Sequence, residues 1–87
     1  GNVTLRIKAS ARKDLLKLPD AILLKAFRLI LQIKEDPYPR GFKKVRGQKD
    51  KLRIWIDRNY RILYEVDSDV ELIDIVYVGL KNESTYR

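Results

Sequence analysis

The sequence contains no cysteine and no histidine, and only 4 glycines and 3 prolines among its 87 residues. The absence of cysteine excludes disulfide bonds and thiolate sites, and the absence of both cysteine and histidine excludes the usual zinc sites. We therefore expect no metal and no cofactor. A chain of this length is near the lower limit for one hydrophobic core, so we expect residues 1–87 to form a single domain that the core alone stabilises.

A long hydrophobic run is also missing. The most apolar stretch, residues 21–33, is interrupted by Lys25, Arg28 and Gln32. These interruptions make it too polar for a membrane span, and it lies too far into the chain for a signal peptide. We expect a soluble, cytoplasmic protein without a membrane partner.

Positively charged residues outnumber negatively charged ones. The 19 lysines and arginines outnumber the 12 aspartates and glutamates, which gives a formal net charge of +7. The positive electrostatic potential that results from this charge attracts polyanions or an acidic protein partner. Charge does not choose between these partners, and solvated lysines and arginines on an ordinary soluble protein would produce the same excess.

Hydrophobic periodicity predicts a strand and two helices in the first half of the chain. Residues 3–8 alternate apolar and polar side chains, which is the pattern of a half-buried strand. Ser10 is the expected N-cap of a short helix that runs to about Leu18, where Pro19 ends it. A longer amphipathic helix follows over residues 20–35 and stops before the next two prolines.

The second half of the chain has the pattern of β-structure. Residues 40–51 have the glycine and charge content of a connecting loop, in which residues 44–46 could pair as a short strand. Three strand-like runs follow, and the last, residues 70–78, is apolar on both faces, as is typical of a strand inside a sheet. The expected fold class is α+β, with a four-stranded, largely antiparallel sheet packed on two helices.

Side-chain chemistry predicts the register of the hairpin that joins the first two of these runs. A three-residue loop from Arg58 to Tyr60 brings the apolar side chains of both strands onto one continuous face. A two-residue loop would instead place Ile56 opposite Arg61. The predicted apolar face consists of Leu52, Ile54, Ile56, Ile62, Tyr64 and Val66.

The opposite face of this hairpin is expected to carry Arg53, Trp55 and Arg61. Two explanations stay open for the arginines: contacts with an anionic ligand, or cross-strand ion pairs that contribute about 0.2–1 kcal/mol each. Trp55 either stacks on a nucleobase or covers the open sheet face as hydrophobic packing. In the predicted register the opposed pairs are Arg53 with Glu65, Trp55 with Leu63 and Asp57 with Arg61.

Three short motifs carry a resemblance to a known family. In combination with the order of strand, helical hairpin and antiparallel strands, they resemble the RelE/ParE superfamily of toxins from type II toxin/antitoxin pairs, over essentially the whole chain. The resemblance implies a RelE-like fold and, for RelE-like members, cleavage of mRNA on the ribosome. The motifs are Lys44-Val45-Arg46-Gly47, Tyr60-Arg61-Ile62-Leu63-Tyr64 and Val78-Gly79-Leu80-Lys81.

The resemblance also implies roles for individual residues. Arg61, Lys81 and Tyr86 match positions that are catalytic in RelE-like toxins, although Lys81 stands where an arginine is frequent and Tyr86 comes slightly early. Arg53 stands where the first of two alternating lysines is found, and Trp55 replaces the second. The residues expected to bind RNA are Arg53, Trp55, Lys44 and Arg46.

The implied chemistry is attack of an RNA 2′-hydroxyl on its own 3′-phosphate, which gives a cyclic phosphate and a 5′-hydroxyl. No metal is needed if clustered positive charge stabilises the phosphorane. The implied activity is that of an mRNA interferase, a metal-independent endoribonuclease that acts on the ribosome. Its implied partners are a cognate antitoxin, the ribosome and mRNA.

Two other functions remain open at this point. A ParE-like member would inhibit DNA gyrase with the same scaffold, and a degenerate toxin would only bind its antitoxin. Lys81 and Tyr86 favour the nuclease. If their side chains lay far from Arg61, the other two functions would be favoured.

Overall fold

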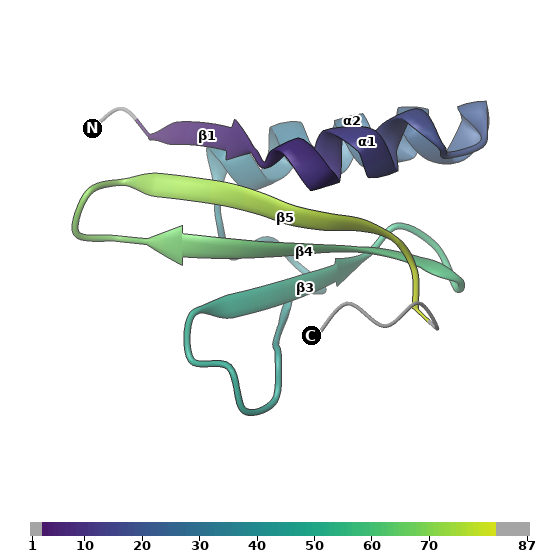
Figure 1. Ribbon diagram of the computed structural model, residues 1–87. Helices are drawn as coiled ribbons and strands as arrows, with labels where there is room; N and C mark the ends of the chain where they lie inside the picture. Colours follow the sequence, from purple (N-terminus) through teal and green to yellow (C-terminus); the bar gives the residue numbers. More distant parts are fainter. Residues whose placement is uncertain (1–2, 82–87) are drawn as a thin grey trace.

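The computed structural model describes residues 3–81, which form a sheet with two helices packed on one face (Figure 1). None of the helices in these residues is long and apolar enough to cross a membrane. The elements in chain order are β1 (Thr4–Ile7), α1 (Ala9–Leu16), α2 (Asp20–Glu35), β2 (Lys43–Lys44), β3 (Lys51–Trp55), β4 (Tyr60–Asp67) and β5 (Leu72–Leu80).

The helices lie where the periodicity predicts them, but the expected cap of the first helix is wrong. The N-cap of α1 is Lys8, without a side-chain cap, and Ser10 is already inside the helix. The reason is that Lys8 donates its backbone N–H to Ile75 of β5 and accepts the backbone N–H of Arg12 at 2.9 Å, so the helix begins directly at the end of β1. Pro19 separates the two helices and serves as the N-cap of α2.

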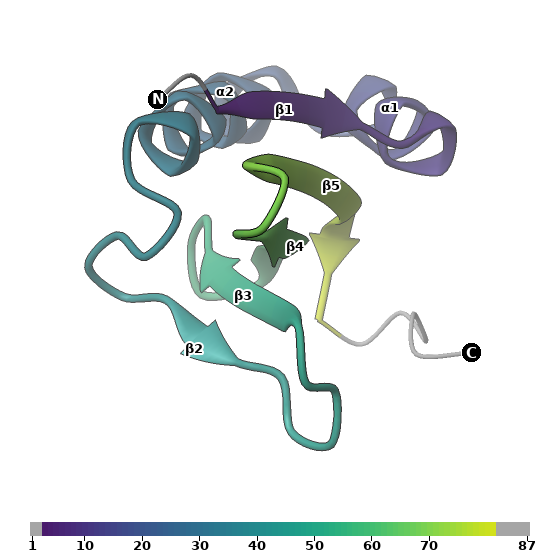
Figure 2. The same ribbon diagram turned by 90° about the vertical axis from the view of Figure 1, so that its left-hand side faces the viewer.

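The sheet has five strands rather than the expected four, in the order β1-β5-β4-β3-β2. The additional strand is β2, where Lys43 and Lys44 pair with Arg53 and Leu52. A pair of residues is too short to show an alternating pattern, so the sequence does not define this strand clearly. β1 runs parallel to β5, and the other neighbours are antiparallel. β5 therefore lies inside the sheet, as predicted (Figure 2).

The predicted register of the β3–β4 hairpin is wrong by two residues. Trp55 lies opposite Arg61, not opposite Leu63, and Ile54 lies opposite Ile62. The connection is longer than predicted because the carboxylate of Asp57 accepts the backbone N–H groups of Asn59 and Tyr60, at 2.8 and 2.9 Å. These bonds form a tight turn, which begins after β3 ends at Trp55. Within it the backbone N–H of Ile56 still donates to the carbonyl of Tyr60 at 2.8 Å.

The predicted apolar face survives this shift, because a slip of two residues leaves every side chain on the same face. Ile54 and Ile62 are both buried against the helices, as predicted. Ile56 and Val66 are half-buried at the edge of the same cluster. The buried residues of this core are Ala11, Leu15, Leu18, Ala26, Ile30, Ile33, Leu52, Ile54, Ile62, Tyr64, Ile73, Ile75 and Val78.

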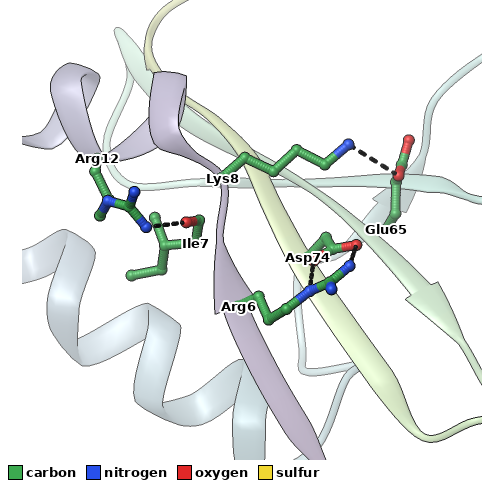
Figure 3. Close-up of polar contacts among 6 residues, drawn as sticks. All are labelled: Arg6, Ile7, Lys8, Arg12, Glu65 and Asp74. Atoms are coloured by element: carbon green, nitrogen blue, oxygen red, sulfur yellow. Dashed lines mark hydrogen bonds and ion pairs between the residues drawn. The ribbon is translucent and has the colours of Figure 1, made fainter.

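Ion pairs connect the strands on the face that points away from the helices (Figure 3). Arg6 on β1 donates to both carboxylate oxygens of Asp74 on β5, at 2.8 and 3.1 Å. This hydrogen bond lowers the pKa of Asp74 and raises that of Arg6. Glu65 lies between Lys8 and Lys51, at 3.9 and 3.8 Å, so it faces these lysines and not Arg53.

Candidate functional site

The hairpin of β3 and β4 places Arg53, Trp55 and Arg61 on one face of the sheet. Trp55 and Arg61 are directly opposed, and Arg53 stands two residues before Trp55 on the same strand. Side chains two residues apart on a strand point the same way, so all three lie on the face away from the helices. The expectation that these residues share a surface is therefore confirmed.

Arg61 differs from its neighbours in burial. Its side chain is only 4% exposed, whereas Arg53 and Trp55 are half-buried. A guanidinium keeps its charge in any protein environment. Arg61 is therefore a fixed cation inside the sheet surface rather than a freely moving surface arginine.

A hollow of about 430 Å³ opens beside these arginines. It lies where the turn after β2 passes over β3, because Lys43 and Lys44 pair with β3 and the backbone N–H of Gln48 then donates to the carbonyl of Val45 at 3.1 Å. Its lining residues are Lys44, Val45, Arg46, Gln48, Arg53 and Arg61. The sequence-predicted residues Lys44, Arg46, Arg53 and Arg61 thus gather around one hollow.

The charges around this hollow have one sign. Its lining contains two lysine or arginine residues from the β2 turn and two from the hairpin, and no aspartate or glutamate. Several cations around one concave surface focus a positive potential there. The arrangement suits a phosphate group or another anion, and the guanidinium groups can each offer a bidentate contact.

A second hollow, at the other end of the hairpin, is lined by more acidic than basic residues. It measures about 840 Å³ and lies toward the β4–β5 turn. Its carboxylates would repel a polyanion, so its size does not make it the candidate site. The acidic residues that line it are Asp50, Glu65, Asp67, Asp69 and Asp74.

Lys81 joins the candidate site from the end of β5. Its backbone N–H donates to the carbonyl of Asn59 at 3.0 Å, and its Nζ lies 5.8 Å from the centre of the Trp55 ring. This distance is within the limit of about 6 Å for a cation–π contact. Trp55 therefore contacts the predicted catalytic lysine. Tyr86, the other predicted catalytic residue of the C-terminal segment, lies outside the described residues.

The sequence analysis did not identify Tyr77, whose side chain contacts the backbone next to the candidate site. Its hydroxyl donates to the carbonyl of Leu80 at 2.7 Å, and its ring lies against Gly79, which is paired with Arg61. Gln48 was also missed, because a single polar turn residue between Gly47 and Lys49 gives no pattern. The only available signal for Tyr77 was the glycine two residues later, since an aromatic ring on a strand often covers a neighbouring glycine.

The described residues, 3–81, contain no group of three or more aspartates and glutamates placed to hold a metal ion. The candidate site offers cations instead of metal ligands. Its arrangement can bind an anion and stabilise negative charge that develops on it, which is electrostatic catalysis by fixed donors.

Comparisons with known proteins identify the family. The family model of the ParE toxin of type II toxin–antitoxin systems, parDE, matches residues 5–84. A search of curated proteins found no match.

Solved structures share the fold. The toxin–antitoxin complex RelBE2 from Mycobacterium tuberculosis is similar, with 26% identity, a TM-score of 0.77, and coverage of 93% of this chain and 100% of that chain. The archaeal RelE–RelB complex from Pyrococcus horikoshii has 21% identity, a TM-score of 0.80, and coverage of 97% and 100%. The isolated RelE toxin of E. coli has 23% identity, a TM-score of 0.79, and coverage of 94% and 87%.

These matches confirm the resemblance drawn from the sequence motifs. The sheet packed on a helical hairpin is the fold of the RelE structures, and the family model spans nearly the whole chain. The protein therefore belongs to the ParE toxin family of type II toxin–antitoxin systems, within the RelE/ParE superfamily.

Proposed function

We propose that this toxin is a metal-independent endoribonuclease that cleaves mRNA on the ribosome and so inhibits translation. One observation carries the proposal: Lys44, Arg46, Arg53 and Arg61, from two separate segments, line a single hollow without a carboxylate. Such a surface suits a phosphate group, which is the group on which the proposed reaction acts.

The proposed reaction breaks one phosphodiester bond without a cofactor. The 2′-oxygen attacks the adjacent phosphorus, the bond from phosphorus to the 5′-oxygen breaks, and a 2′,3′-cyclic phosphate and a 5′-hydroxyl result. The 2′-hydroxyl loses a proton and the leaving 5′-oxygen gains one. Fixed cations stabilise the extra negative charge on the phosphorane.

The residues have distinct roles in this proposal. Arg61 holds the scissile phosphate, because its guanidinium is fixed at the hollow. Lys81 protonates the leaving 5′-oxygen or neutralises its charge, and Tyr86 orients or deprotonates the 2′-hydroxyl. Arg53, Lys44 and Arg46 contact flanking phosphates, and Trp55 lies at the edge of this surface.

The ribosome is the proposed partner that completes the site. The chain has no histidine, the side chain that most often moves protons at neutral pH. A partner that orients the 2′-hydroxyl in line with the leaving oxygen would supply rate acceleration that this chain lacks. The proposal therefore includes slow cleavage of free mRNA and fast cleavage of ribosome-bound mRNA.

A second candidate is inhibition of DNA gyrase in the manner of ParE. The observation that favours it is the match of the ParE family model to residues 5–84. In that case the basic hollow would contact the DNA or an acidic surface of gyrase, and Lys81 would have no chemical role.

One experiment separates the two candidates. Purified wild-type protein is added to ribosomes programmed with a defined mRNA and, in parallel, to a gyrase supercoiling reaction. We expect new mRNA 5′ ends that carry a hydroxyl, detected by primer extension and by direct labelling with polynucleotide kinase. Intact mRNA together with blocked supercoiling would establish gyrase inhibition instead.

Controls keep this experiment specific. Arg28→Ala removes an exposed arginine of α2 and should cleave like the wild type. Free mRNA without ribosomes should remain largely intact. If neither mRNA nor gyrase is affected, the protein is a degenerate toxin that only binds its antitoxin.

We also propose a cognate antitoxin as partner, because structural relatives were solved as toxin–antitoxin complexes. The net charge of +7 favours an acidic or amphipathic segment. The proposed antitoxin partner can be tested by co-expressing this protein with the neighbouring open reading frame and purifying the complex. Failure of any neighbouring product to co-purify would contradict the proposal.

A further inference from the structure

The aromatic ring of Tyr77 occupies the space beside Gly79 on the open face of the sheet. A Cβ atom at position 79 would lie 2.6 Å from the Tyr77 hydroxyl oxygen and 2.9 Å from Cζ, closer than any real contact allows. The ring therefore lies directly across the Gly79 backbone. Any larger residue at position 79 would force the Tyr77 ring to shift.

The hydroxyl of Tyr77 fixes one end of the next peptide group. It donates to the carbonyl oxygen of Leu80 at 2.7 Å. The N–H of that same peptide unit belongs to Lys81 and donates to the carbonyl of Asn59 at 3.0 Å. Because a peptide unit is planar, the two hydrogen bonds together set its orientation and hence the direction in which the Lys81 side chain leaves the backbone.

The side chain of Lys81 then reaches Trp55, with its Nζ 5.8 Å from the ring centre. Trp55 and Gly79 are the two residues that flank Arg61 across the sheet, from β3 and β5 respectively. The lysine is thus held next to the rung of the sheet that contains the buried arginine.

We propose that Tyr77 is a positioning residue that acts through Lys81, with Trp55 as the second contact that holds the lysine. The catalytic consequence rests on the proposed nuclease function, but the positioning itself does not. A lysine has a long flexible side chain, so a fixed backbone and a ring contact reduce the number of positions its ammonium group can occupy. Tyr77 and Trp55 together restrict the positions of the Lys81 ammonium group to the vicinity of the Trp55 ring.

Tryptophan fluorescence and amide hydrogen exchange both test the positioning of Lys81 without a cleavage assay. Trp55 is the single tryptophan of the chain, so its fluorescence reports on Lys81 directly. We expect Lys81→Met to shift the Trp55 emission, and Tyr77→Phe, which keeps the ring over Gly79, to shift it in the same direction. Tyr77→Phe should add nothing when Lys81 is already methionine.

Amide hydrogen exchange measured by NMR supplies the local readout. Tyr77→Phe frees the Leu80 carbonyl, so we expect the Lys81 amide to exchange about 5-fold to 10-fold faster, in line with the loss of one neutral hydrogen bond. The amides of Ile62 and Ile75, in the buried core, should be unchanged. Tyr38→Phe, at a half-exposed tyrosine far from β5 in the chain, is the matched control. Unchanged Trp55 emission and unchanged Lys81 exchange in Tyr77→Phe would overturn the proposal.

A cleavage measurement tests the catalytic consequence. On programmed ribosomes, Tyr77→Phe should lower the single-turnover rate about 5-fold to 10-fold without changing the half-saturating ribosome concentration. In a Lys81→Met background it should have no further effect, since residues that act through one another are not additive. An equal loss in both backgrounds would mean that Tyr77 acts through the fold and would overturn the proposal.

The two proposals fail in distinguishable ways. If the wild-type protein does not cleave mRNA, the nuclease function is wrong, and the fluorescence and exchange data still decide whether Tyr77 positions Lys81. If the wild type cleaves but Tyr77→Phe does so at the wild-type rate, the nuclease function stands and the positioning role is wrong.

Discussion

The hydroxyl of Tyr64 donates a 2.7 Å hydrogen bond to the carbonyl oxygen of Pro37, a residue 27 positions earlier in the chain. Tyr64 is on the central strand and is fully buried, while Pro37 follows the end of α2. Burial raises the pKa of Tyr64 far above its usual range, so the hydroxyl remains a donor at any physiological pH. This bond ties the sheet to the segment that leads into the candidate site.

We expect Tyr64→Phe to lower the free energy of unfolding by about 1–2 kcal/mol, because the substitution removes the donor and leaves the Pro37 carbonyl without it. Chemical denaturation followed by circular dichroism measures this change. Tyr38→Phe, at a side chain that is 47% exposed, is the control and should be close to neutral. Equal stabilities of the two variants would contradict the prediction.

Gly79→Ala should also destabilise the protein, by about 1–3 kcal/mol, since the added methyl group displaces the Tyr77 ring. The loss should disappear in a Tyr77→Ala background, where nothing occupies that space. Gly47→Ala is the comparison, because Gly47 has a φ of 76° and open space around it. Its cost comes from the backbone and should persist when Tyr77 is removed.

Arg61→Ala should lower single-turnover cleavage on programmed ribosomes by a factor of about 10² to 10³, as expected for the loss of one fixed electrostatic donor. Arg61→Lys should also be impaired, because an ammonium group cannot make the bidentate phosphate contact. Arg61 is buried, so thermal melting must show that each variant is folded at the assay temperature. Wild-type rates in a folded Arg61→Ala variant would remove Arg61 from the site.

Lys44→Ala and Arg46→Ala should each weaken binding to programmed ribosomes and reduce the salt dependence of that binding. Each phosphate contact removed should lower the slope of log K against log salt concentration by about 0.7 to 0.9. Lys25→Ala, at an exposed lysine of α2, should leave both quantities unchanged. A uniform effect of all three substitutions would indicate that only net charge matters.

Acid should destabilise the protein partly through Asp57. Hydrogen bonds from the backbone N–H groups of Asn59 and Tyr60 hold the pKa of Asp57 below its ordinary value of 3.8. A carboxylate with a lowered pKa in the folded state contributes its full stabilisation above its unfolded pKa and loses it as the pH falls through the folded pKa. We therefore expect the melting temperature of the wild type to fall below about pH 4.

Asp57→Asn tests this prediction, because its amide oxygen can still accept both backbone hydrogen bonds but does not titrate in this range. The variant should have a smaller fall in melting temperature between pH 5 and pH 3 than the wild type, measured by calorimetry. Identical pH profiles would show that Asp57 does not contribute to the acid dependence.

The local pattern of the sequence determined which side of each strand is buried. Ile54 and Ile62 face the helices and Arg53 and Arg61 face away, although the predicted register of their hairpin was wrong. The reason is that side chains alternate with a period of two, so an error of two residues preserves both faces. The two helices could also be predicted from local features, namely their apolar periodicity and the position of Pro19 between them.

The tertiary structure decided which residues meet. The register of the β3–β4 hairpin depends on the hydrogen bonds that Asp57 accepts inside the turn. In the sequence, the predicted pairing of Asp57 with Arg61 looks more favourable than the turn that is formed. Long-range pairing alone brings the turn after β2 over Arg53 and Arg61 and places Tyr77 against Gly79. The alternation of side chains is a property of the local backbone, whereas the basic hollow and the position of Lys81 depend on packing between segments far apart in the chain.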